Sequence, residues 1–256
     1  MHSLYSHVMM NVTSYALYNQ SDARPFILTK GSYASTGKYT PSVAHTNNER
    51  SWDSLYYGLA SVLRSQMFGL PHSGSDICGY KTGGDKLDEE LCQRWYQLAT
   101  FFPLARHSQD SEGPRTDPNS IQTEAIKASI KKTMHDRMQY LRLMYTCMFE
   151  TSDSGGTCLD PIQFRYTVPA AQWTPAAPNT QPVFTNSYMF AGSLLVSPVM
   201  SQLPAGTTDF KAYFPQGSWV NMNDWSDIVQ GKDDVVTLKV RDTVNVHLAP
   251  GAVIPF

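Results

Sequence analysis

Charged and amide side chains follow two short apolar runs in the first third of the chain. The run 25–29 leads into a polar loop that contains Lys30 and Asn47, and the run 68–72 leads into Gly74 and Asp76. Side chains of these types bind polar ligands and exchange protons when a fold brings them together. The pattern therefore predicts a binding or catalytic site made from the loops that follow two strands.

Helical elements must position these loops. Apolar residues recur at helical spacing from Trp52 onward, so the chain alternates strand, polar loop and helix twice. Such alternation predicts parallel strands whose loops collect at one edge of a sheet. The segment after Cys158 is rich in proline and is expected to form loops and short strands. Helices are expected at 4–18, 52–67, 87–101 and 122–149, and later strands at 194–200, 210–214, 218–221, 235–240 and 244–248.

The composition argues against several classes of function. The chain has 256 residues and 41% hydrophobic content, enough for the core of one large domain or two modest ones. Its net charge of −2 argues against a nucleic-acid partner. No apolar run approaches the roughly 18 residues of a transmembrane segment, and the first residues do not resemble a signal peptide. No metal-site, phosphate-loop or dinucleotide motif occurs, so no metal and no cofactor is expected.

Several longer stretches carry a family resemblance. They are Arg24-Pro-Phe-Ile-Leu-Thr-Lys-Gly-Ser-Tyr33, Phe68-Gly-Leu-Pro-His-Ser-Gly-Ser-Asp-Ile-Cys-Gly-Tyr80, the segment from Leu91 to Arg106, and Ser187-Tyr-Met-Phe-Ala-Gly-Ser-Leu-Leu-Val-Ser-Pro-Val199. Together they resemble glycoside hydrolase family 31, the α-glucosidases and their relatives. Long motifs in the family's order are far more specific than short ones, so the chain is identified as a member of this family.

The resemblance implies an α/β part followed by a β part. The first would be the second half of a (β/α)8 TIM-type barrel at 1–158, and the second a loop-rich link and an antiparallel, β-sandwich-like domain at 159–256. The family's nucleophile motif, Trp-x-Asp-Met-Asn-Glu, does not occur in the chain. We therefore expect the upstream half to be a separate chain or to be lost. Another protein chain is expected to cover the open barrel edge, against the strand 25–29 or the helix 4–18.

The position of the catalytic acid is altered. A retaining glycosidase needs two carboxyl groups about 5 Å apart, one as nucleophile and one as proton donor. In the family the donor is the Asp of a Gly-Asp-Asn triplet, and counting back from Trp52 assigns its position to Asn47. An amide cannot supply the proton. Glu49 is a possible stand-in, although a displacement of about 1 Å can cost on the order of a hundredfold in rate. The resemblance thus implies a glycoside hydrolase fold without its acid.

The positions that contact sugar in the family are also altered in part. Lys30 replaces an Arg and lacks the paired donors of a guanidinium, and His107 is displaced by one residue from the family's His. A vestigial carbohydrate site would use Lys30, Trp52, Asp76, Tyr80, Arg106 and His107. The alternative is that Asp76 and Arg106 pair with each other at the barrel rim, because buried charges need partners.

The four cysteines allow three pairings, so sequence alone does not fix the connectivity. The resemblance implies a disulfide between Cys78 and Cys92, and hence an oxidising compartment: the secretory pathway, a vesicle lumen or the extracellular space. Four buried thiols in a reducing compartment are the alternative.

Trp219 and Trp225 are near each other in the predicted β-domain and could stack on a sugar ring. Aromatic residues at strand spacing are usually part of a core, and we expect that here.

Two functions are compatible with these observations. In the first, the chain has lost catalysis and serves as a structural or interaction subunit, completed by another chain. In the second, it is the downstream chain of a split or processed α-glycosidase that hydrolyses α-glucosides by a retaining mechanism. Fold does not decide between them, since function lies in the site. The loop at Asn47 favours the first.

Overall fold

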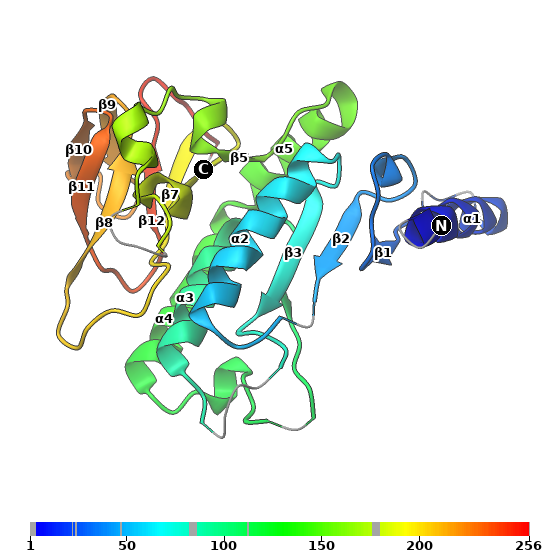
Figure 1. Ribbon diagram of the computed structural model, residues 1–256, viewed down its shortest axis with the longest axis horizontal. Helices are drawn as coiled ribbons and strands as arrows, with labels where there is room; N and C mark the ends of the chain where they lie inside the picture. The colour runs from blue at the N-terminus through cyan, green and yellow to red at the C-terminus, as the bar shows by residue number, and fades with distance from the viewer. Residues whose placement is uncertain are drawn as a thin grey trace.

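The computed structural model describes residues 4–21, 23, 25–46, 48–81, 86–111, 113–175 and 180–255. Asn47, the predicted acid position, lies outside these residues. Figure 1 shows two parts side by side: a partial α/β barrel, coloured blue to green, and a β-domain, coloured yellow to red.

The barrel part contains four parallel strands in chain order. They are β1 (Leu28–Thr29), β2 (Ser42–His45), β3 (His72–Ile77) and β4 (Arg106–His107). The sequence pattern missed β2 and wrongly placed the third strand at 68–72. Both strands contain many small polar residues, so they lack the apolar run that marks a buried strand. Their side chains are buried because a helix covers the sheet: Ser73 and Ser75 face α2 (Trp52–Met67) and are 0% and 3% exposed.

Five helices accompany the sheet. They are α1 (Tyr5–Gln20), α2, α3 (Glu89–Leu98), α4 (Glu124–Gln139) and α5 (Leu141–Ser154). The bounds of α2 agree with the sequence prediction, and its first turn is capped by Ser51, which accepts a hydrogen bond from the Ser54 N–H. The single helix expected at 122–149 is wrong. It is two helices with Tyr140 between them, and the second continues to Ser154, where Gly155 has a φ of 80°. Short 3-10 helices lie at 36–38, 99–101, 118–120, 162–164, 170–173 and 183–186.

The β-domain has two antiparallel sheets. The larger has the order β10 (Ile228–Gly231), β9 (Gly217–Asn221), β12 (Asn245–Leu248), β7 (Leu194–Ser197), β6 (Tyr188–Phe190) and β5 (Leu159–Pro161). The smaller pairs β11 (Asp234–Lys239) with β8 (Asp209–Phe214). A core cluster joins them: Met189, Leu195 and Trp219 come from the first sheet, and Ala212, Phe214 and Leu238 from the second. The predicted sandwich-like arrangement is therefore present.

A second core cluster crosses from the barrel part into the β-domain. It contains Trp95 of α3 and Phe101 together with Tyr188 and Phe190 of β6. The Tyr188 hydroxyl, fully buried, donates a hydrogen bond of 3.2 Å to the Leu98 carbonyl at the end of α3. The two parts are thus joined by apolar burial and by satisfied polar groups.

Helix α1 is different from the other helices. None of its residues is buried, and apolar side chains such as Tyr5, Val12 and Tyr15 are more than 60% exposed. Figure 1 shows it beyond β1, at the side away from the β-domain. In the described residues we find no helix with the length and apolar character required to cross a bilayer.

Candidate functional site

An ion pair occupies the carboxyl ends of the last two barrel strands. Strand register places Asp76 of β3 beside Arg106 of β4, so their side chains are on the same face of the sheet. Arg106 donates two hydrogen bonds to Asp76 Oδ1, from Nε at 3.0 Å and from a terminal nitrogen at 2.7 Å. Asp76 is 0% exposed, so the guanidinium compensates a fully buried carboxylate. Asp76 lies within β3 and not in a following loop, which corrects the sequence placement.

His107 is on the other face of β4. It is paired in register with Ile77, and consecutive strand residues point to opposite faces. Its Nε2 forms a hydrogen bond with Thr116 Oγ1, and burial lowers the pKa of the imidazole. Arg106 and His107 therefore do not act on the same face of the sheet.

The loop that follows β2 is fixed to the loop that follows β3. Tyr80 and Lys81 both donate their N–H groups to the Asn48 carbonyl, at 2.9 and 3.1 Å. Glu49 forms a parallel bridge with Lys81, and its side chain is exposed. The possible stand-in acid thus lies on a fixed backbone and is exposed to solvent, whereas Asp76 is buried.

Lys30, Trp52 and Tyr80 have separate environments. Lys30 is exposed and lines a pocket of about 290 Å³ together with Ala44, Thr46, Asn48 and residues of α2. Trp52 is half-buried against the barrel core, and Tyr80 is half-buried. Among the described residues that line this pocket, Lys30 is the sole one from the predicted sugar-contacting set. Within the predicted set, Asp76 and Arg106 are directly paired.

Two charged residues at this edge were missed by sequence reasoning. Arg50 donates from Nε to the Cys78 carbonyl at 3.1 Å, and burial lowers the pKa of its guanidinium while the Asp110 carboxylate opposes that shift. The Asp110 N–H donates to the Tyr80 carbonyl at 3.2 Å, so the loop after β4 joins the same network. No sequence signal marks either residue, because each is a single charge in a polar loop.

Two disulfides hold the surrounding segments. Cys78 is bonded to Cys92, the pairing that the resemblance implies, with 4.5 Å between the Cα atoms. Cys147 is bonded to Cys158, with 5.8 Å between the Cα atoms, and joins α5 to the residue before β5. The first bond anchors the loop after Asp76 to α3, and the second lies at the junction with the β-domain.

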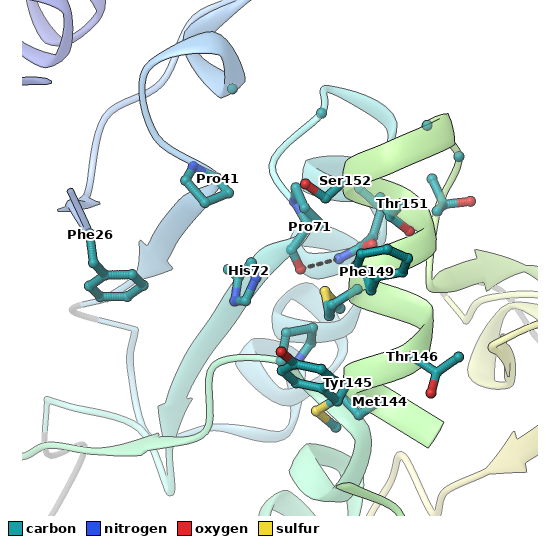
Figure 2. A pocket seen from close by; sticks show the side chains of 18 of the residues that line it. Phe26, Pro41, Pro71, His72, Met144, Tyr145, Thr146, Phe149, Thr151 and Ser152 are labelled. Atoms are coloured by element: carbon teal, nitrogen blue, oxygen red, sulfur yellow. Dashed lines mark hydrogen bonds between the residues drawn. The ribbon is translucent and has the colours of Figure 1, made fainter. Parts of the chain in front are cut away.

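A pocket larger than the one beside Lys30 lies at the opposite end of the strands. It has a volume of about 1860 Å³, and Pro41, Pro71 and His72 line it where β2 and β3 begin. Figure 2 shows Phe26 and Pro41 on one side and Tyr145 and Phe149 of α5 on the other. Sites in barrels of this type form at the carboxyl ends of strands, so this pocket is not the predicted site. In the part of the chain that the structure describes, no group of three or more His, Cys, Asp or Glu residues could hold a metal ion.

Two family models match the chain. Residues 1–147 match the glycosyl hydrolases family 31 TIM-barrel domain, and residues 159–254 match the glycosyl hydrolase family 31 C-terminal domain. A probable alpha-glucosidase of Oryza sativa subsp. japonica is 33% identical over an alignment of 258 positions, which covers 99% of this chain and 27% of that protein. Alpha-xylosidase 1 of Arabidopsis thaliana is 30% identical over 99% of this chain and 26% of its own length. The chain therefore spans about a quarter of the length of these relatives.

Solved structures have the same fold. A dextranase of this family from Flavobacterium johnsoniae, complexed with glucose, superposes with a TM-score of 0.83 at 22% identity, over 99% of this chain and 30% of that one. The ER glucosidase II heterodimer, a catalytic subunit with the binding domain of a regulatory subunit, gives a TM-score of 0.77 at 20% identity, over 96% of this chain and 25% of that one. Matched along both of its parts, in sequence and in fold, the chain belongs to glycoside hydrolase family 31.

Proposed function

We propose that this chain is an α-glucosidase-like protein that has lost catalysis and acts as a structural or interaction subunit, completed by another chain. The observation that carries the proposal is the environment of two carboxyl groups near the strand ends, those of Asp76 and Glu49. Asp76 is buried and bound by Arg106, and Glu49 on the neighbouring loop is exposed. A retaining glycosidase needs two carboxyl groups about 5 Å apart, and an Asp76 carboxylate that is held by Arg106 is a poor proton donor.

The sequence supports the same conclusion. Asn47 occupies the position of the family's acid, and an amide does not titrate near neutral pH. Lys30 in place of an Arg removes the bidentate donor of the sugar contact. Loss of a general acid alone costs about 10² to 10⁴ in rate.

A partner chain is the second element of the proposal. Strand β1 is at the end of the four-stranded parallel sheet, and α1 beside it has no buried residue. Parallel sheets are normally covered on both faces, and open edges pair with other chains. A partner packed on β1 and α1 would bury the apolar surface of α1, so we expect the purified chain to self-associate or to bind that partner. A stable, monodisperse monomer of this chain would contradict this part of the proposal.

The test of catalysis uses the native assembly. Hydrolysis of an activated aryl α-glucoside and of maltose is measured for the wild type and for Glu49→Gln, with Asp110→Asn as the matched control at the same edge. We expect no turnover above the buffer rate in any of the three.

Other outcomes have distinct meanings. Turnover abolished by Glu49→Gln alone would show that the acid has moved by two residues and that the chain is an enzyme subunit. Turnover unaffected by either substitution would place both carboxyl groups on another chain. That result would support the second function, the downstream chain of a working α-glycosidase. The likeness to the rice and Arabidopsis relatives keeps this function as the alternative.

A further inference from the structure

Two tryptophans six residues apart have opposite environments. Trp219 of β9 is 0% exposed, packs against Phe214 and donates from Nε1 to the Pro215 carbonyl at 2.8 Å. Trp225, in the turn between β9 and β10, is 70% exposed. The expectation that both belong to the core is therefore wrong for Trp225. A side chain that could bury the largest apolar area of any residue remains in water.

The turn that carries Trp225 is fixed by hydrogen bonds. Its anchor is Asn221, which is 1% exposed: the side-chain oxygen accepts from the Asn223 N–H at 2.9 Å, and Nδ2 donates to Asp227 Oδ2 at 2.9 Å. Arg241 from the neighbouring segment also donates to Asp227 Oδ2, at 2.9 Å. The Asp227 N–H donates to the Asp224 carbonyl at 2.9 Å, so the backbone closes on both sides of the tryptophan.

Asp224 adds a carboxylate next to the indole ring in the sequence. Its Oδ1 accepts hydrogen bonds from the N–H and the hydroxyl of Ser226, at 3.1 and 2.6 Å, and these bonds lower the pKa of the carboxyl. Among the described residues no protein donor to Oδ2 is found, which leaves that oxygen as an acceptor for a ligand. The turn therefore offers an exposed indole on a hydrogen-bonded backbone, next in the sequence to a carboxylate acceptor that is held by Ser226.

An exposed indole and a neighbouring carboxylate favour some classes of ligand over others. A polyhydroxylated ring has an apolar C–H face for the indole and hydroxyl donors for a carboxylate. A phosphate-bearing ligand would be repelled by Asp224, and a quaternary ammonium group is usually held by a cage of several aromatic rings. The ordering cost of binding is small, because a fixed turn and a side chain with two χ angles have little freedom to lose.

We propose that Trp225 and Asp224 form a carbohydrate-binding platform on the β-domain that takes neutral polysaccharide chains, for which glycogen and dextran are the probes. The platform goes beyond the proposed function, because it retains polysaccharides whether or not any chain of the assembly hydrolyses them.

The test is affinity electrophoresis of the full chain in native gels that contain glycogen or dextran, with polysaccharide-free gels as reference. We expect retardation of the wild type, at least tenfold weaker apparent affinity for Trp225→Ala, and partial retention for Trp225→Phe. Ile228→Ala is the matched control, since Ile228 is an exposed apolar residue of β10, 49% exposed, and it should migrate as the wild type. Thermal unfolding of each variant verifies that the β-domain is folded.

Each remaining outcome overturns the inference. Absence of wild-type retardation in both gels would exclude the platform. Retardation that survives Trp225→Ala would place glucan binding elsewhere, for example at the barrel rim. A change of oligomeric state in Trp225→Ala without a change in the gels would identify the turn as a protein contact. The two proposals can fail independently. Turnover in the hydrolysis assay would contradict the loss of catalysis, and it would not change how Trp225→Ala migrates in the polysaccharide gels.

Discussion

The β-domain and the barrel part differ in how completely their apolar side chains are buried. In the β-domain the two sheets enclose a shared core that includes Trp219 and Phe214, both 0% exposed. In the barrel part the sheet ends at β1, and the helix beside it, α1, has no buried residue. Several apolar side chains of α1, among them Tyr5, Val12 and Tyr15, are exposed, and α1 lies at the side of the molecule away from the β-domain (Figure 1). Buried cores therefore stabilise the β-domain, the junction and the α2–α3 side of the barrel part, whereas α1 belongs to none of them and depends on what covers it.

The largest expected effect tests this comparison directly. Trp219→Ala should reduce the free energy of unfolding by about 4 kcal/mol, because it leaves a cavity in the core between the two sheets and removes the indole hydrogen bond. Val12→Ala on α1 should change it by less than about 0.5 kcal/mol, since Val12 is 61% exposed. Chemical denaturation of both variants measures the difference. Equal losses would show that α1 is buried in solution, by self-association or a partner.

The junction disulfide should have the next largest effect. Replacing Cys147 and Cys158 together by Ala should cost about 3 kcal/mol, because the bond closes a loop of about a dozen residues in the unfolded chain. The matched control is the pair Cys78 and Cys92, which closes a loop of similar length inside the barrel part. Hydrogen exchange distinguishes the two variants. Loss of the Cys147–Cys158 bond should reduce amide protection in α5 and β5, and loss of the Cys78–Cys92 bond should reduce it at the rim of the barrel. Identical exchange maps would contradict a junction role.

The smallest effect concerns pH. His247 of β12 is 0% exposed and packs edge-on against Phe214, and neither ring nitrogen has a hydrogen-bond partner among the described residues. Burial lowers the pKa of His247 to about 4 from an ordinary value of 6.5, with Asp227 opposing and Arg241 adding to the shift. Stability linked to this group is therefore complete above pH 6.5 and is lost as pH falls toward the folded-state pKa.

The expected loss at pH 5, relative to pH 8, is about 2 kcal/mol from this residue. His247→Leu should remove that share and leave the remainder, because His45, His72 and His107 also have lowered pKa values through burial. Denaturation curves at the two pH values provide the measurement. If the variant keeps the full pH dependence of the wild type, the histidines of the barrel part, and not the β-domain, control acid sensitivity.

Much of the fold could be predicted from the sequence where periodicity and burial agree. The helix 52–67 matches α2 because Leu55, Leu59 and Val62 form one apolar face beneath a Ser cap. The expected strands of the β-domain match β7, β8, β9, β11 and β12 to within a few residues, whereas the short strands β5, β6 and β10 were missed. Strand β2 was not, because Ser-Val-Ala-His gives no apolar pattern. In β3 the buried Ser75 is satisfied by the Trp95 indole N–H at 3.3 Å, a tertiary contact that no local window contains.

The candidate site was predictable in part. The pairing of Asp76 with Arg106 followed from the need of a buried carboxylate for a cation, and the structure contains that pair. The different face of His107 follows from strand alternation, and it could have been predicted had β4 been recognised as a strand. Arg50 and Asp110 could not be predicted, because only the folded loops bring their charges near each other.

The core that crosses between the two parts limits how the chain can be divided. The side-chain amide of Gln97 on α3 donates to the carbonyl of Asp242 at 3.0 Å, in addition to the Tyr188 contact with Leu98. A cut near residue 158 that separated the two parts would expose the apolar partners of Phe190 and Leu194 to water and break these hydrogen bonds. The chain should consequently melt in one cooperative calorimetric transition, because neither part is expected to remain folded without the other.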